Sequence, residues 1–209
     1  PLVLITATEH YGAVINRPFR FERYLQDAAE RRHTLTRLFM LFREQQHSHN
    51  PYSTCKPEST DYVSPYPRTG PGNAIDGLPK YDLDQWNPEF FDRLHRFLAL
   101  ASDYGVVVEV VILSNTYNED IWMLNPLHPK NNINGTEEIS FPEYMTKRHP
   151  KLFARQRALV RKIVEETNRY DNLLYEVCNE PTGATPGIAN APTLDEVNTW
   201  QTILAQDIR

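Results

Sequence analysis

Apolar runs of strand length alternate with helical patterns along the whole chain. Runs rich in β-branched and aliphatic residues are separated by segments in which apolar residues recur every three or four positions. The expected strands cover residues 2–7, 34–42, 106–113 and 173–178. The expected helices cover residues 19–32, 88–104, 150–169 and 194–208. Strands that alternate with helices predict a parallel sheet, either an open doubly wound sheet or a barrel.

Two of the expected helices carry clear start signals. Pro88 follows Asn87, and proline suits the first helical position because the N–H it lacks has no partner there. Thr193 precedes the last helical pattern, and its hydroxyl can accept a hydrogen bond from a free backbone N–H of the first turn. We therefore expect helices to begin directly after Asn87 and Thr193.

The connections that follow the strands are much longer than those that lead into them. They cover residues 43–86, 115–149 and 179–193, whereas a helix-to-strand connection such as Tyr104-Gly105 is a few residues long. Both parallel architectures place their sites at the carboxyl ends of the strands. Elaboration after every strand, without a Gly-rich phosphate loop after the first one, favours a (β/α)8 barrel.

A (β/α)8 TIM barrel needs eight strands and roughly 250 residues. This sequence offers four strands in 209 residues. We therefore predict an α/β fold in which residues 1–209 form the amino-terminal part of a single catalytic domain, about the first four β/α units of the barrel. A half barrel leaves a sheet edge and apolar helix faces bare, so we expect the missing half barrel or an oligomer partner to cover them.

Charge and composition argue against several classes of partner. The 22 basic and 27 acidic residues include no basic cluster that could follow a phosphate backbone, so no nucleic-acid partner is expected. No apolar run approaches the ~20 residues of a membrane span. Cys55 and Cys178 form no evident disulfide framework, and His47 and His49 have no carboxylate at ligand spacing. The sequence therefore predicts no metal and no other cofactor.

The fourth apolar run ends abruptly in polar residues, in the sequence NLLYEVCNEP. Asn179 and Glu180 come directly after this expected strand, at the mouth of the predicted barrel. Apolar walls beside a carboxylate favour its protonated form, which suits a general acid. The plain structural alternative is that the two residues only cap the loop before Pro181, but a position at the end of a barrel strand favours catalysis.

The same run closely resembles the fourth-strand motif of the clan A retaining glycoside hydrolases, the cellulase-like (family 5-like) (β/α)8 enzymes. The order of several other segments is also similar to that of cellulase-like bacterial members. These segments are TEHYGAVIN, TLTRLFM, YDLDQWNPEFFDRL, GVVVEVVIL and HPKLFARQRALVRKIVEE. The resemblance covers nearly the whole chain, and it implies a hydrolase that cleaves β-linked glycosides in an oligo- or polysaccharide.

The resemblance also implies roles for three residues. Glu180 would be the acid/base, Asn179 would hold the 2-hydroxyl of the bound sugar, and Arg37 would support the nucleophile. The nucleophile of this clan comes from the seventh strand, so we expect it to lie outside this chain. The resemblance favours a secreted or periplasmic location, and the chain itself, which contains no signal peptide, leaves the compartment open.

Further candidate substrate contacts lie at the ends of the other strands. His10 and Tyr11 follow the first expected strand, where a sugar hydroxyl could be bound. Clan members often have a histidine after the third strand, and here Asn115 and Tyr117 stand in that loop as the corresponding candidates. Trp122 follows them, and its indole could stack on a sugar ring or pack within the loop.

Strand alternation also brings three charged residues to one face of the sheet. Arg37, Glu109 and Glu176 lie at positions whose side chains could meet inside the barrel. Buried charges must be paired. We therefore predict that Arg37 pairs with Glu109 or Glu176.

Two other function classes stay open on the residues alone. A non-catalytic carbohydrate-binding barrel, or pseudoenzyme, would bind sugar without turnover. A different barrel enzyme would use Glu180 as a proton-transfer base or a metal ligand, and a chelator would then abolish a metal-dependent activity.

Overall fold

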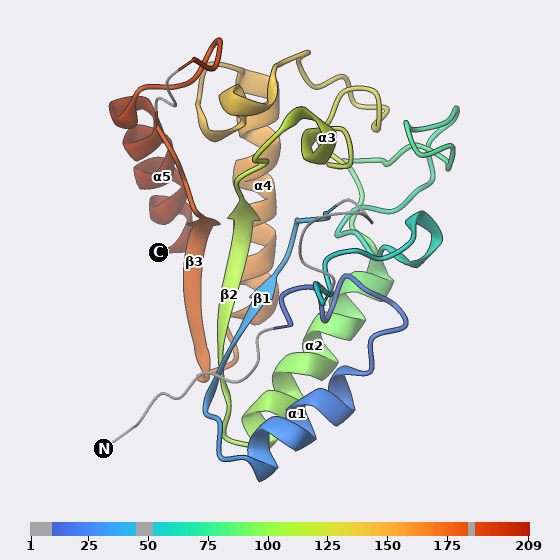
Figure 1. The fold of residues 1–209 in the computed structure, drawn as a ribbon, viewed down its shortest axis with the longest axis vertical. Coiled ribbons are helices and arrows are strands. Elements are labelled where there is room, and N and C mark those ends of the chain that lie inside the picture. The colour runs from blue at the N-terminus through green and yellow to red at the C-terminus, as the bar shows by residue number, and fades with distance from the viewer. Residues whose placement is uncertain (1–9, 45–51, 184–186) are drawn as a thin grey trace.

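The computed structural model describes residues 10–44, 52–183 and 187–209. Three of the expected strands form one parallel sheet in the order β1-β2-β3 (Figure 1). These strands are β1 (Leu35–Phe39), β2 (Val107–Ser114) and β3 (Leu173–Asn179). The predicted parallel sheet is confirmed. The first expected strand, at residues 2–7, lies outside the described residues, as do His47 and His49.

All four expected helices form, within about two residues of their predicted bounds. They are α1 (Phe21–Glu30), α2 (Pro88–Asp103), α4 (Pro150–Thr167) and α5 (Leu194–Ile208). Both predicted caps are present, because Asn87 accepts a hydrogen bond from the backbone of Glu89 and Thr193 accepts one from the backbone of Glu196. Three short helices were not predicted: η1 (Ser59–Asp61), α3 (Glu119–Trp122) and η2 (Phe141–Met145).

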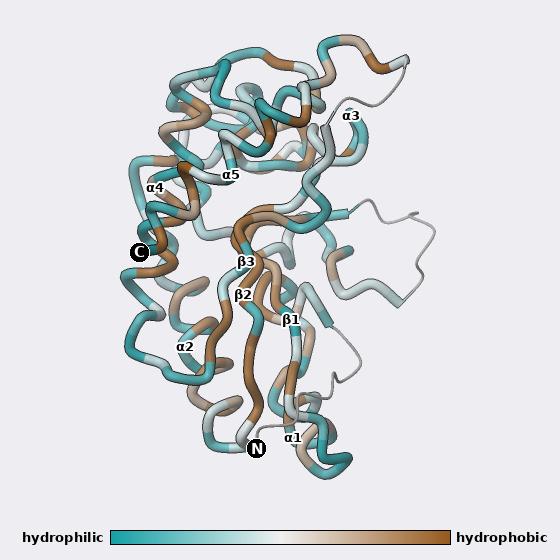
Figure 2. Tube along the Cα trace, turned by 90° about the vertical axis from the view of Figure 1, so that its left-hand side faces the viewer, coloured by the Kyte–Doolittle hydropathy of each residue, from teal (hydrophilic) through white to brown (hydrophobic). Residues whose placement is uncertain are grey.

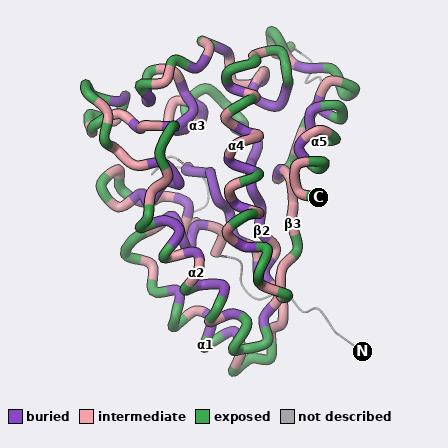
Figure 3. The backbone as a smooth tube through the Cα atoms, turned by 180° about the vertical axis from the view of Figure 1, so that it is seen from behind, coloured by how far each residue is buried: buried purple, intermediate pink, exposed green. Residues whose placement is uncertain are grey.

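The helices pack against one face of the sheet. Figure 2 shows α2 and α4 on one side of the strands. Tyr24 of α1 bonds Thr36 of β1, and Thr167 of α4 bonds Tyr175 of β3, so these two strand positions face the helices. Figure 3 shows buried residues along β2, the central strand.

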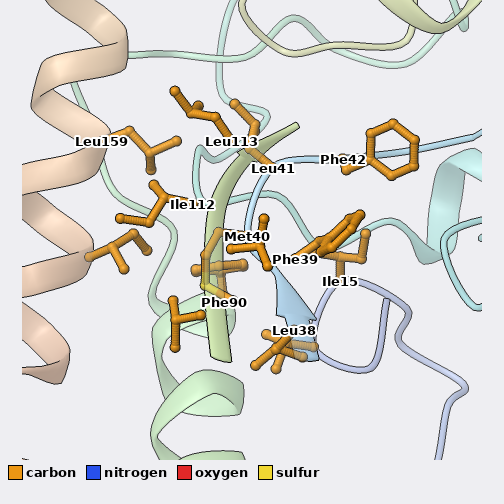
Figure 4. Close-up of a cluster of buried hydrophobic side chains, with 14 of the residues drawn as sticks. Ile15, Leu38, Phe39, Met40, Leu41, Phe42, Phe90, Ile112, Leu113 and Leu159 are labelled. Carbon is orange, nitrogen blue, oxygen red and sulfur yellow. The ribbon is translucent and has the colours of Figure 1, made fainter. Parts of the chain in front are cut away.

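The hydrophobic core lies between this face and the helices and continues above the strand ends. Ile112 of β2 is fully buried, as are Phe90 of α2 and Leu159 of α4 (Figure 4). The residues Met40 to Phe42, which follow β1, are also buried. Met40 still donates a backbone hydrogen bond to Val111 of β2, and the strand predicted to residue 42 ends at Phe39. Within the described residues, no helix has the length and apolar character that a membrane crossing requires.

Asparagine side chains fix the long loop after β2. The amide of Asn131 donates hydrogen bonds to the carbonyls of Met123 and Asn125, and the amide of Asn132 donates one to the carbonyl of His128. Buried backbone carbonyls need such partners. The Asn-rich stretch therefore holds the loop in place above the carboxyl end of the sheet.

Candidate active site

A pocket opens at the carboxyl ends of β1 and β3, and five of the predicted site residues line it. They are Tyr11, Arg37, Tyr117, Asn179 and Glu180. These residues come from four separate parts of the sequence, and the parallel sheet brings them to one edge. The candidate site therefore lies where ligands of parallel α/β folds generally bind.

Arg37 forms the floor of this pocket. Its Nε lies 2.9 Å from Glu109 Oε2, and its Nη2 donates a very short hydrogen bond to Glu176. The prediction that Arg37 pairs with Glu109 or Glu176 is confirmed, and it pairs with both. Partial burial and the negative charge of Glu176 raise the pKa of Glu109, although the charge of Arg37 acts in the opposite direction.

Asn179 does not follow the alternation predicted for its strand. That alternation places it on the face opposite Glu176, yet its Oδ1 accepts a hydrogen bond of 3.2 Å from Arg37 Nη2, the same nitrogen that bonds Glu176. Asn179 is the last residue of β3, and the next residue, Glu180, has a φ of 49°. Because the chain leaves the extended conformation there, the amide reaches over the edge of the sheet.

Tyr117 joins Asn179 to Glu180. Its Oη lies 2.6 Å from Glu180 Oε2 and accepts a hydrogen bond of 2.7 Å from Asn179 Nδ2. Like Glu180, Tyr117 has a positive φ, of 54°, which residues other than glycine seldom adopt. Such outliers cluster at functional sites. Burial, and then the hydrogen bond and charge of Glu180, raise the pKa of the Tyr117 phenol.

Asn115 supports this arrangement from behind rather than lining the pocket. Its Nδ2 donates hydrogen bonds to the Glu180 carbonyl and to Thr182 Oγ1, at 3.1 and 3.2 Å, and its Oδ1 accepts one of 2.9 Å from the Tyr117 backbone. The side chain is buried. Both ends of the amide bond the protein, and its role as a substrate contact stays a prediction.

Two further expected sugar contacts lie elsewhere. Trp122 is fully buried against His128 and Tyr144, so its indole has no free face for a sugar ring, and the packing alternative is the correct one. His10 packs against Phe19 and Tyr24 and does not line the pocket that contains Glu180. It lines a separate pocket, and its role as a substrate contact stays a prediction.

Five lining residues of the pocket were not predicted. They are Phe39, Phe42, Glu44, Ser53 and Cys55. Glu44 closely follows the first described strand, and its position at a strand end is a signal that sequence reasoning could have used. Ser53 and Cys55 reach the pocket through a close backbone approach that no sequence pattern shows. A Cβ on Gly12 would lie 2.3 Å from the Thr54 carbonyl oxygen, so this contact requires glycine.

Residues 56–203, most of the chain, match the model of a family described as a domain of unknown function, DUF6298. The chain belongs to the DUF6298 family. No curated protein matches this DUF6298 chain.

The fold of this DUF6298 chain is similar to that of solved glycoside hydrolases. GH5_18 from Bifidobacterium longum subsp. longum aligns with a TM-score of 0.55 and 11% identity over 99% of this chain and 41% of its own. A family 5 glycoside hydrolase from Bacteroides vulgatus aligns with a TM-score of 0.53 and 12% identity, over 100% of this chain and 33% of its own. Endoglucanase Cel5A from Pseudomonas stutzeri aligns with a TM-score of 0.51 and 15% identity, over 98% of this chain and 47% of its own.

At these identities the similarity shows the fold, an α/β arrangement with a parallel sheet like that of GH5 barrels. The chain spans a third to about half of the length of these solved structures.

Proposed function

We propose that residues 1–209 supply about the first four β/α units of a (β/α)8 barrel that is completed by further chain or by a partner. The share of the solved structures that aligns, between 33% and 47%, supports this proposal. So does the sheet face that carries Arg37, where Leu174 is 47% exposed among the described residues. In a closed barrel this face would point inward, and side chains of the remaining strands would cover Leu174.

The proposed function is that of a retaining glycoside hydrolase acting on β-linked glycosides. The observation that carries it is the shared pocket of Asn179 and Glu180, an amide and a carboxylate at the mouth of one strand with Arg37 below them. This arrangement matches the roles implied by the resemblance of the sequence NLLYEVCNEP. The pocket, of about 190 Å³, is smaller than the roughly 300–1,000 Å³ of sites for drug-sized ligands, as expected for one wall of a larger cleft.

In the proposed mechanism Glu180 acts twice. It first donates its proton to the glycosidic oxygen as the bond to the sugar breaks, while a carboxylate from outside this chain attacks the anomeric carbon. Glu180 then removes a proton from the water that hydrolyses the covalent intermediate. The attacking carboxylate would lie roughly 5–5.5 Å from Glu180. Asn179 would bond the 2-hydroxyl of the sugar, a contact that strengthens in the transition state.

The structural neighbours suggest substrates for a first test. A GH5_18 variant was crystallised with Manβ1-4GlcNAc, and GH5_18 from Streptomyces cattleya with GlcNAc. The Pseudomonas stutzeri neighbour is an endoglucanase. Both a β-mannosyl disaccharide and β-linked gluco-oligosaccharides are therefore suitable, together with aryl β-glycosides as chromogenic probes.

The test is Glu180→Ala in the whole protein that contains this chain. We expect hydrolysis of unactivated β-linked oligosaccharides to fall by about 10²–10⁴-fold, the usual contribution of a general acid–base. Aryl glycosides with good leaving groups should lose less, because departure of the leaving group then needs no proton. Azide should restore turnover and give a β-glycosyl azide, since it attacks the covalent intermediate without a general base.

Glu44→Gln is the matched control, because it neutralises another carboxyl that lines the same pocket. It should form no glycosyl azide. Unchanged hydrolysis by Glu180→Ala would contradict the assigned role. A wild-type protein that binds these sugars but hydrolyses none would support the non-catalytic alternative.

A further inference from the structure

Tyr117, which no motif assigns to catalysis, bonds both residues that the proposed function requires. The direction of each hydrogen bond follows from the chemistry of the groups. Arg37 can only donate, so the oxygen of the Asn179 amide faces Arg37 and its nitrogen faces Tyr117. The Tyr117 hydroxyl accepts from that nitrogen, and its single hydrogen is directed to the Glu180 carboxylate at 2.6 Å.

The result is a directed chain from Arg37 through Asn179 and Tyr117 to Glu180. While Glu180 is ionised, each link fixes the next one, since reversing any bond would leave two donors or two acceptors facing each other. The second N–H of the Asn179 side chain takes no part in this series of hydrogen bonds. Arg37 and Tyr117 therefore hold the amide from its two ends, and Tyr117 also holds the Glu180 carboxylate.

The backbone holds Tyr117 and Glu180 in matching conformations. Both have a positive φ, and the side chain of Asn115 bonds the Tyr117 N–H and the Glu180 carbonyl together. The Tyr117 ring also packs edge-to-face on Phe42, with 6.0 Å between ring centroids. The phenol is thus held in one position by two loops and not only by its own hydroxyl.

We propose that Tyr117 is a positioning residue, which holds the Asn179 amide and the Glu180 carboxyl in one arrangement. This inference rests on the proposed function for its catalytic meaning, whereas the contact itself can be tested without turnover. Tyr117 thereby keeps the Glu180 carboxyl where it can act first on the glycosidic oxygen and then on the attacking water.

Tyr117→Phe is the first variant, because it removes only the hydroxyl and keeps the ring packed on Phe42. With an aryl β-glycoside, we expect kcat to fall by about 10-fold or more because the pair is no longer held, while KM changes little. The other side chains that line the pocket keep their identity in this variant.

A rise in KM with kcat unchanged would mean that the Tyr117 hydroxyl only binds substrate, and it would overturn the proposal. The second measurement needs no hydrolysis. In protein labelled with ¹³Cζ-tyrosine, the Tyr117 resonance is the one that disappears in Tyr117→Phe. In Glu180→Gln this resonance should titrate at lower pH than in the wild type, since the charge that raises the pKa of Tyr117 is gone.

Tyr144 is the internal control, because burial is the main cause that raises its pKa and Glu180 is not among the causes. The Tyr144 resonance should titrate in the same way in the wild type and in Glu180→Gln. Identical titration of Tyr117 with and without the Glu180 charge would overturn the contact. If the wild-type protein hydrolyses no glycoside and Tyr117 still responds to Glu180, the proposed function fails while the positioning contact stands.

Discussion

The two faces of the sheet use the same three strands in different ways. On the helix-facing side, Val108, Val110 and Ile112 of β2 are fully buried. On the opposite side, the side chains of Arg37 and Glu109 are 20% and 28% exposed and form an ion pair. One face is packed against helices, whereas the other carries charge and, at its carboxyl edge, the candidate site.

This difference separates stability from chemistry within one element. Burial of apolar side chains stabilises the helix-facing side, at about 25 cal/mol for each Å² removed from water. The ion pairs of Arg37 on the other side are partly exposed, and such pairs contribute little net stability. Their value is to hold Asn179 and the pocket floor in one geometry.

The largest effect is expected from a cavity on the helix-facing side. Ile112→Ala should lower the free energy of unfolding by about 2–5 kcal/mol, because Ile112 is completely buried and rigid packing cannot fill the space. Equilibrium denaturation in urea measures it. A loss below about 1 kcal/mol would show that this face is not the main core.

A smaller effect is expected on the other face, and it tests the proposed barrel. In the whole protein, Leu174→Ala should cost about 1–3 kcal/mol if further strands bury Leu174, whereas the described residues leave it 47% exposed. Ile75→Ala is the control, since Ile75 is 44% exposed on a loop away from the sheet. Equal, near-zero losses for both variants would contradict closure of a barrel over this face.

The regular elements could be predicted from the sequence because their signals are local. Apolar periodicity located three strands and four helices, and Asn87 and Thr193 marked helix starts through bonds to residues two or three positions away. The loop path could not be predicted in this way. Arg43 bonds Asp76, 33 residues further on, and this pair depends on where the intervening chain runs.

The part of the candidate site that depends on local signals could also be predicted. Position at a strand end identified Asn179 and Glu180, and alternation identified the pairing of Arg37. Tyr117 was expected as a sugar contact, but its bond to Glu180 spans 63 residues and requires a positive φ that tyrosine seldom adopts. For Trp122 the sequence left stacking on a sugar and packing in the loop open, because loop composition does not show which aromatic ring turns inward.

The smallest expected change in the free energy of unfolding concerns Glu109. Its ionised carboxylate should lower the stability, whereas a carboxylate in a usual ion pair raises it. The pKa of Glu109 is raised above its ordinary value of 4.5, so folding favours its protonated form. At neutral pH the native state therefore bears a cost for the charged carboxylate, which disappears as the pH falls below the ordinary value. Glu109→Gln avoids this cost, while Arg37 keeps Glu176 as its partner.

We therefore expect Glu109→Gln to stabilise the protein by less than about 1 kcal/mol near pH 7, and the two proteins to converge below pH 4.5. Urea denaturation across this pH range measures it. Glu196→Gln is the opposite control, because the hydrogen bond from Arg148 lowers the pKa of Glu196 to about 2. The wild type should be more stable than Glu196→Gln at neutral pH, and this difference in the free energy of unfolding should disappear as the pH falls towards 2. If Glu109→Gln were also destabilising at pH 7, the attraction of Arg37 would outweigh burial, and the charged face would contribute to stability after all.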